Sequence, residues 1–120
     1  MRYLLDTDSV SYALRGQGGV GGRITSHRPS QLCISSITLA ELRFGADRRR
    51  SRKLHGLIDA FISAVEVAPF DEKARAARGT PIGELDGLIA AHAVSLRSVL
   101  VTNNLRHFSK VPGLKVENWL

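Results

Sequence analysis

Short apolar runs alternate with segments of helical periodicity along the 120 residues, and this alternation limits the possible folds more than any other feature. Each run ends abruptly in polar residues, as buried strands commonly do. The expected strands are Tyr3–Leu5, Leu32–Ser35, Val65–Pro69, Ser98–Thr102 and a short edge strand at Leu114–Glu117. Because helices separate the strands, we expect the α/β class. A central parallel sheet of four to five strands is covered by helices on both faces, in a single domain over residues 1–120.

The clearest helix is expected between Leu54 and Val65, where apolar residues at i, i+3, i+4, i+7, i+8 and i+11 form one continuous face. The glycine-rich segment Gln17–Gly22 follows no strand and lacks the Lys-Ser/Thr pair of a phosphate-binding loop, so we interpret it as a flexible connection. The other expected helices are Ser9–Arg15, a helix capped by Ser36 or Thr38, a short helix over Phe70–Arg78, and a helix from Thr80-Pro81 to Leu96.

The composition excludes several classes of protein. A net charge of +6 and a hydrophobic content of 43% indicate a globular chain and favour a polyanionic partner, nucleic acid first. The longest charge-free apolar stretch, Gly87–Leu96, is far too short to span a bilayer. Asp6 interrupts the N-terminus where a signal region would need apolar residues. We therefore expect no membrane contact and a cytoplasmic location. The single Cys33 excludes an internal disulfide and a cysteine-based zinc site, and its apolar neighbours favour a buried, inert thiol.

Two carboxylates follow the first strand: Asp6 stands at its carboxyl end and Asp8 two residues later. In open α/β sheets, ligands bind at this end of the strands. If the chain stays extended, Asp6 and Asp8 point the same way and can bind a cation together. If the chain already turns into a helix at Thr7, only Asp6 faces the site and Asp8 caps the helix. A third interpretation is that both acids simply begin a loop and cap a helix.

Acids from three distant segments are expected at one edge of the sheet: Asp6, Glu41 in the helix after the second strand, and Asp86 in the helix before the fourth. Thr102 and Asn104, which follow the fourth strand, reach the same edge. Carboxylates packed together repel one another unless a cation neutralises them, and oxygen-only ligands select Mg²⁺ or Mn²⁺ over zinc. Such a site in a basic protein suits the hydrolysis of phosphodiesters.

Some of these features also have a purely structural interpretation. Thr38 and Glu41 match a capping box, in which the glutamate only closes the first turn of a helix. His92 lies on the apolar side of its helix, and such a histidine is more often packed and hydrogen-bonded than a ligand.

A cluster of basic residues lies between the second and third strands. We expect it to hold RNA phosphates, although a solvated charged face explains the same pattern. Its members are Arg43, Arg48, Arg49, Arg50 and Lys53.

Four ordered segments resemble the PIN-domain ribonucleases, and most closely the VapC toxins of bacterial toxin–antitoxin pairs: LLDTD, ITLAELRFGA, GTPIGELDGLIAAHA and VLVTNNLRHFSKVPGLKVENW. The resemblance implies a PIN-like three-layer α/β/α fold and an Mg²⁺-dependent endoribonuclease that cleaves structured RNA such as tRNA. It also implies a homodimer held inactive by a VapB-like antitoxin, whose acidic part the basic cluster is also suited to bind. By position, Asp6, Glu41 and Asp86 match the family's acidic metal-site residues, Thr102 its site-lining hydroxyl, and Asn104 the position of a fourth acid in many members.

The chain departs from the family pattern in three ways. Asp8 stands where most members have asparagine, and Asn104 weakens any position for a second metal ion. Between Asp71 and Gly79 the chain is roughly ten residues shorter than its relatives, which is nearly three helical turns. The alternative function is therefore a degenerate PIN domain that binds RNA or an antitoxin without cleavage.

A haloacid-dehalogenase-like phosphatase is a second enzymatic interpretation, because Asp6-Thr7-Asp8 and Thr102 imitate the first two motifs of that family. It requires a catalytic lysine and an acidic pair later in the chain. After Thr102 the sequence offers Lys110 and Lys115 but only Glu117 as an acid, so the overlap is best explained as chance.

Overall fold

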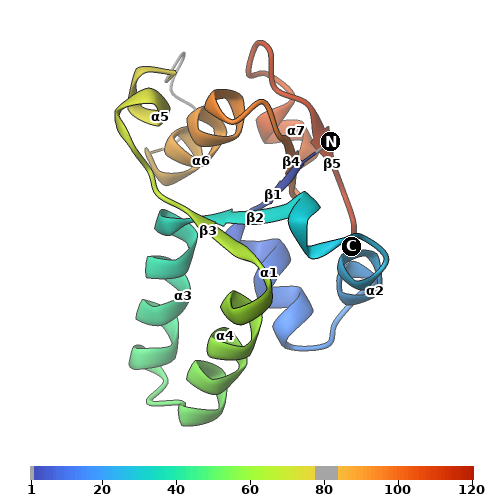
Figure 1. Ribbon diagram of the computed structural model, residues 1–120, viewed down its shortest axis with the longest axis vertical. Helices are drawn as coiled ribbons and strands as arrows, with labels where there is room; N and C mark the ends of the chain where they lie inside the picture. Colours follow the sequence, from blue (N-terminus) through green and yellow to red (C-terminus); the bar gives the residue numbers. More distant parts are fainter. Residues whose placement is uncertain (1, 78–83) are drawn as a thin grey trace.

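Five parallel strands form a single sheet in the order β3-β2-β1-β4-β5 (Figure 1). The computed structural model describes residues 2–77 and 84–120. The strands are β1 (Tyr3–Leu5), β2 (Leu32–Ser35), β3 (Glu66–Ala68), β4 (Val99–Val101) and β5 (Val116–Glu117). The prediction of a parallel sheet with a short fifth strand at its edge is confirmed.

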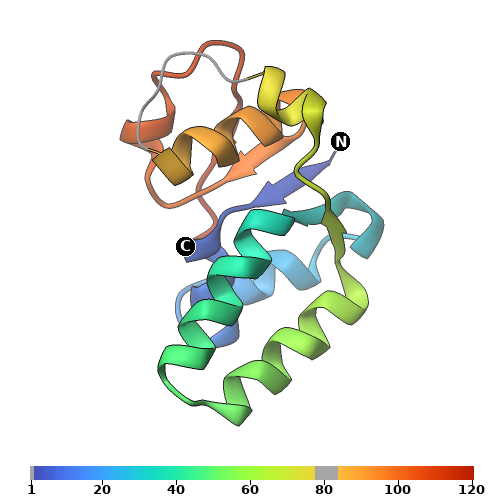
Figure 2. The ribbon, with the colours of Figure 1, turned by 90° about the vertical axis from the view of Figure 1, so that its left-hand side faces the viewer.

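Helices cover both faces of the sheet. The helices α1 to α4 lie on one face and α5 to α7 on the other, which confirms the three-layer arrangement (Figures 1 and 2). They are α1 (Thr7–Leu14), α2 (Val20–Thr25), α3 (Ser36–Arg48), α4 (Arg52–Ala64), α5 (Glu72–Ala76), α6 (Glu84–Ser95) and α7 (Leu105–Phe108), with a 3₁₀ turn η1 (Pro29–Gln31) before β2. None of the described helices is long and apolar enough to cross a bilayer.

Neighbouring residues of each strand feed two separate cores, because side chains alternate between the faces of a sheet. Leu5, Ile34 and Val101 stand side by side in register and pack under α1 to α4. Their predecessors Leu4, Cys33 and Leu100 pack on the opposite face against α6 and α7. Cys33 is free and fully buried, and burial raises the pKa of its thiol, so the prediction of a buried thiol is confirmed.

The winding of the sheet reverses between β1 and β4, where a ligand crevice is expected. The chain begins at β1, winds outward through β2 and β3, and then crosses to β4 on the other side of β1. Ligands of open α/β sheets bind outside the carboxyl ends of the strands where the winding reverses in this way. The backbone N–H of Asp6 donates to the carbonyl of Val101 at 3.0 Å, so the ends of these two strands are tied together at the crevice.

The glycine-rich connection is only partly a loop. Helix α2 begins at Val20, inside the segment expected to be flexible, so this prediction is wrong beyond Gly19. The side chain of Val20 is 1% exposed and belongs to the same core as Trp119, and this burial outweighs the poor helix propensity of the neighbouring glycines. Trp119 is itself buried, so the C-terminal segment closes over this core.

Several predicted helix ends need comment. Helix α3 is capped by Ser35 rather than by Ser36 or Thr38, which shifts its start by one residue. The short helix α7 was not predicted. The expected start of α6 at Thr80-Pro81 lies outside the described residues, as does the expected end of α5.

Candidate active site

Asp6 connects β1 to α1 and caps that helix. Its Oδ1 accepts the N–H of Ser9 at 2.8 Å, and the helix begins immediately at Thr7. The extended pincer of Asp6 and Asp8 is therefore wrong, because the chain turns before Asp8. Asp8 is not the cap either; it lies exposed in the first helical turn, where the helix dipole favours negative charge.

The carboxylate of Asp6 is buried beside Thr102, at the ends of the two strands that flank the crevice. Asp6 is 8% exposed and Thr102 fully buried. Burial raises the pKa of Asp6, and hydrogen bonds from the Thr102 hydroxyl and from Ser9 oppose that rise. The Thr102 oxygen in turn accepts the backbone N–H of Asn104 at 3.0 Å. A buried carboxylate with a raised pKa is a group that a nearby cation would stabilise in its charged form.

Glu41 reaches the same edge from the second turn of α3. Its Oε1 accepts the hydroxyl of Thr7 at 2.7 Å, and the Thr7 oxygen lies 3.2 Å from that of Thr38. The capping-box interpretation of Glu41 is wrong, because Ser35 caps α3 by accepting the N–H of Ile37 at 3.1 Å. Sequence reasoning missed Thr7 as the residue that positions Glu41. Its place between two acids directly after a strand was the available signal.

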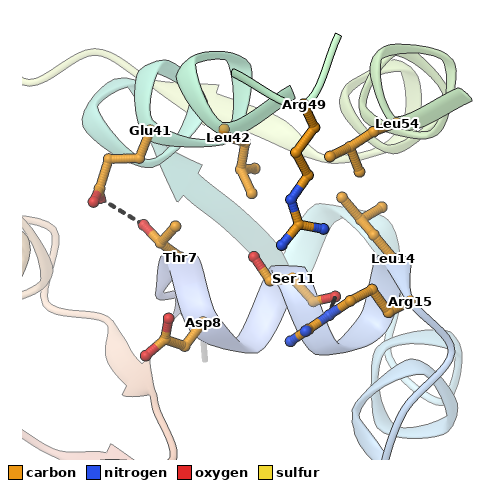
Figure 3. A pocket seen from close by; sticks show the side chains of 10 residues that line it. Thr7, Asp8, Ser11, Leu14, Arg15, Glu41, Leu42, Arg49 and Leu54 are labelled. Atoms are coloured by element: carbon orange, nitrogen blue, oxygen red, sulfur yellow. Dashed lines mark hydrogen bonds between the residues drawn. The ribbon is translucent and has the colours of Figure 1, made fainter. Parts of the chain in front are cut away.

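Asp8 and Glu41 line one pocket of about 220 Å³ between α1, α3 and the start of α4 (Figure 3). The apolar part of its lining comes from Leu14, Leu42 and Leu54. Charged and hydroxyl side chains surround this apolar part. They belong to Thr7, Asp8, Ser11, Arg15, Glu41 and Arg49.

Asp86 approaches the edge from the other face of the sheet. It lies near the start of α6, and its side chain is about half exposed, with Oδ2 at 3.3 Å from Nε2 of His107 on α7. Asn104 precedes α7, is exposed, and makes no side-chain hydrogen bond to cap that helix. His107 is a second residue that sequence reasoning missed. Its contact with Asp86 spans two helices, and no local pattern indicates it.

The oxygen atoms of these acids suit a hard cation, whereas their present arrangement does not enclose one. Carboxylate and hydroxyl oxygens are the donors that Mg²⁺ and Mn²⁺ prefer. Within residues 2–77 and 84–120, no three Asp, Glu, His or Cys side chains lie close enough together to hold one metal ion. Asp86 points to His107 and Glu41 to Thr7. An ion shared by these acids would therefore require Asp86 and Glu41 to leave their present partners.

The basic cluster divides into two parts. The guanidinium of Arg43 donates to Nδ1 of His55 at 2.9 Å and pairs with Asp59, while Nε2 of His55 lies 2.8 Å from Asp47. Arg43 therefore ties α3 to α4, which corrects its assignment as an RNA-binding residue.

The remaining basic residues surround the turn between α3 and α4. Arg50 adopts a left-handed backbone conformation there, with φ of 48°. All of them are exposed, and none forms an ion pair with another described residue. They are Arg48, Arg49, Arg50 and Lys53.

His92 is a packed histidine, as the structural interpretation predicted. It is 1% exposed, and its Nδ1 lies 2.8 Å from Oγ of Ser35, while the ring of Phe70 meets it edge-on. Burial lowers its pKa, although Asp71 and the backbone at Pro69 oppose this effect. His92 thereby joins α6 to the start of α3 beneath the candidate site.

Comparison with known proteins identifies close relatives over the whole chain. The family model of the PIN domain matches residues 3–114. The tRNA(fMet)-specific endonuclease VapC of Salmonella typhimurium is 35% identical, over 99% of this chain and 98% of that protein. Ribonuclease VapC2 of Haemophilus influenzae is 34% identical, over 100% and 99% of the two chains. The alignment with the Salmonella protein spans 130 positions against 120 residues here, so at least ten of its positions face a gap in this chain.

Solved structures agree with the sequence matches. The VapBC2 complex from Rickettsia felis, bound to a DNA fragment from its promoter, contains a chain that superposes with a TM-score of 0.89 at 30% identity, over 100% of both chains. The DNA-bound VapBC complex from Salmonella typhimurium gives a TM-score of 0.88 at 34% identity, over 100% of this chain and 99% of that one.

Proposed function

The chain belongs to the PIN-domain family and, within it, to the VapC ribonucleases of toxin–antitoxin pairs, and we propose on this basis that it is an Mg²⁺-dependent endoribonuclease that cleaves structured RNA. One observation carries the proposal: a buried Asp6–Thr102 pair lies at the crevice of the sheet, with Glu41 and Asp86 at the same edge. The name of the Salmonella relative, a tRNA(fMet)-specific endonuclease, supports tRNA as the substrate class. The family assignment replaces the phosphatase interpretation.

Asp6, Glu41 and Asp86 would hold the ion, with Asp8 adding negative charge beside it. When bound, Mg²⁺ supplies a more acidic water and stabilises negative charge on the scissile phosphate. Thr102 keeps the Asp6 carboxylate in place through its hydroxyl, and Thr7 does the same for Glu41. Asp86 must exchange its contact with His107 for the ion. Mn²⁺, which accepts the same oxygen ligands, should replace Mg²⁺.

The exposed basic residues at the α3–α4 turn are proposed to hold RNA phosphates. These residues lack ion-pair partners among the described residues, and the net charge of +6 favours a polyanion. Replacing Arg48, Arg49 and Arg50 together with glutamine should weaken RNA binding and flatten its salt dependence, by a slope of roughly 0.7 for each phosphate that the variant no longer binds. An unchanged slope would return the cluster to a solvated charged face.

The proposed partners are a VapB-like antitoxin and a second copy of the chain. Solved relatives include complexes described as VapBC and as a toxin–antitoxin complex from Klebsiella pneumoniae, which supports the antitoxin. Light scattering of the purified chain, alone and after co-expression with the product of the neighbouring gene, measures both assemblies. A monomer alone would contradict the homodimer, and the absence of a complex would contradict that antitoxin.

One observation favours the alternative, a degenerate PIN domain that binds RNA or an antitoxin without cleavage. At least ten positions of the alignment with the Salmonella enzyme face gaps in this chain, as many residues as nearly three helical turns. A degenerate domain would retain its partners and lose dependence on metal.

The deciding experiment incubates the purified protein with unfractionated tRNA, with Mg²⁺ or with a chelator. We expect discrete cleavage products only with the metal, and none from a matched Asp86→Asn variant. RNA binding without cleavage, in a protein that calorimetry shows to bind no Mg²⁺, would favour the degenerate alternative. Cleavage by the Asp86→Asn variant at the wild-type rate would refute the site assignment.

A further inference from the structure

The pocket beside Asp8 and Glu41 has a second, basic end. Asp8 and Ser11 of α1 and Arg15, the C-cap of that helix, stand at i, i+3 and i+7 and therefore share one face. Figure 3 shows the two carboxylates at one end of the pocket and the guanidinium groups of Arg15 and Arg49 at the other, with the Ser11 hydroxyl between them. The proposed metal chemistry uses only the acidic end, and of the basic end the proposed function includes Arg49 alone, as a member of the exposed basic cluster.

We propose that the basic end is a phosphate-binding subsite, in which Arg15, Arg49 and Ser11 hold the RNA phosphate adjacent to the one that is cleaved. The inference rests on the proposed ribonuclease function and adds a specific position for the RNA backbone. It also assigns roles to Arg15 and Ser11, which lie on α1, outside the basic cluster of the α3–α4 turn.

The polar groups at this end are available to a ligand. Among residues 2–77 and 84–120, the guanidinium of Arg49 and the hydroxyl of Ser11 have no hydrogen-bond or ion-pair partner. Arg15 is oriented, since its Nε donates to the carbonyl of Ser11 at 3.2 Å and its guanidinium lies 5.1 Å from the centre of the Tyr12 ring. Two arginines that face one pocket from different helices suit a tetrahedral anion with several acceptor oxygens.

The separation of the two ends leaves room for a phosphate besides the one at the acids. Seven residues of helix separate Asp8 from Arg15, which is roughly 10 Å along the axis at 1.5 Å per residue. Helical side chains lean toward the N-terminus, so the guanidinium lies closer to the acids than its own Cα does. Between the two ends, the apolar side chains of Leu14, Leu42 and Leu54 offer a surface for the ribose or base.

Gly45 gives an independent reason to expect a ligand here. It lies in the interior of α3, where glycine is unfavourable, and it lines the same pocket. A Cβ added at Gly45 would meet no atom within 4 Å, so packing within the described structure does not require glycine. A ligand that approaches α3 closely at Gly45 would explain why this position has no side chain.

The test measures the binding of unfractionated tRNA in an Asp86→Asn background, which prevents cleavage and leaves the pocket intact. Replacing Arg15 and Arg49 together with glutamine should weaken binding about tenfold and lower the salt slope by roughly 0.7, the value for one single-strand phosphate contact. The matched control replaces Arg28 and Lys115, two exposed cations that precede β2 and β5 at the opposite edge of the sheet. We expect the control to bind RNA like its parent.

Gly45→Ala provides a second variant that should fold at least as well as the parent. Alanine should raise the melting temperature, because it favours the helix, and yet weaken tRNA binding several-fold by narrowing the pocket. The subsite would be overturned if the Arg15→Gln/Arg49→Gln variant bound tRNA with the same affinity as the control variant. A double variant that binds tRNA normally but no longer binds a co-expressed antitoxin would also overturn it, since the pocket then belongs to the antitoxin. Failure of the parent protein itself to bind tRNA would instead contradict the proposed function.

Discussion

The two sides of the candidate site hold their acids in different ways. On the α1–α3 side, the Thr7 hydroxyl donates to Glu41 and leaves its negative charge intact. On the α6–α7 side, Asp86 lies against His107, an imidazole that competes with a cation when it is protonated. Asp6 lies between the two sides, tied to Thr102 at the end of the neighbouring strand. The comparison teaches that one side is already oriented for the proposed ion, whereas the other would have to rearrange to bind it.

Removing either acid should have the largest effect, because the proposed ion would need a carboxylate from each side. Glu41→Gln and Asp86→Asn should each lower the rate of RNA cleavage by about two to three orders of magnitude, the loss typical of removing one organised electrostatic group. Circular dichroism should show an intact fold in both variants. If only one of the two variants loses activity, a single side carries the chemistry and the comparison fails.

Thr7→Val should affect the oriented side alone. It removes the hydroxyl that donates to Glu41, and loss of a group that orients a metal ligand typically costs ten- to a hundredfold in affinity or activity. Thr7→Ser, which keeps the hydroxyl, should restore cleavage. Mg²⁺ titration by calorimetry separates this positioning role from a structural one, because a purely structural role would lower stability and leave the metal affinity unchanged.

His92 joins the two sides, and it should make stability depend on pH. Burial lowers its pKa below the ordinary value of 6.5, so the unfolded chain binds a proton more readily than the folded one. Its contribution to the free energy of unfolding should be complete above pH 6.5 and be lost as the pH falls through the lowered pKa. Urea titrations between neutral and acidic pH test this, with His92→Gln as the comparison. An equal loss in both proteins would assign the effect to other groups.

His107→Ala should have the smallest effect and should sharpen the contrast between the sides. It releases Asp86 from a competing partner, and we expect Mg²⁺ to bind at most about fivefold more tightly, since partly exposed ion pairs contribute roughly 0.2–1 kcal/mol. Calorimetry of the purified variant measures the change. Weaker binding of Mg²⁺ would show that His107 instead holds Asp86 in the orientation that the ion requires.

Much of the fold followed from local patterns. The apolar runs located all five strands to within one or two residues, and the period of Leu54–Val65 located α4, because burial of one face is set by residues close together in sequence. The expected parallel arrangement was enough to place Asp6 and Thr102 at one edge of the sheet. It left three interpretations of Asp6 and Asp8 open, and the structure decides among them, because α1 begins at Thr7 and so makes Asp6 its buried cap.

Only the tertiary structure determined which partners the charged and polar side chains have, because those partners lie far away in the sequence. Arg43 is held by residues of α4, Glu41 by Thr7, and Asp86 by His107. Likewise, α2 forms because Val20 packs into the core that Trp119 shares, at the other end of the sequence. The hydrophobic periodicity of a segment indicates which of its faces is buried. The partner of a polar group depends instead on which distant segments come into contact in the fold. The sequence alone therefore determined the sheet and the identity of the acids, and the packing of helices on both faces determined which partner each acid has.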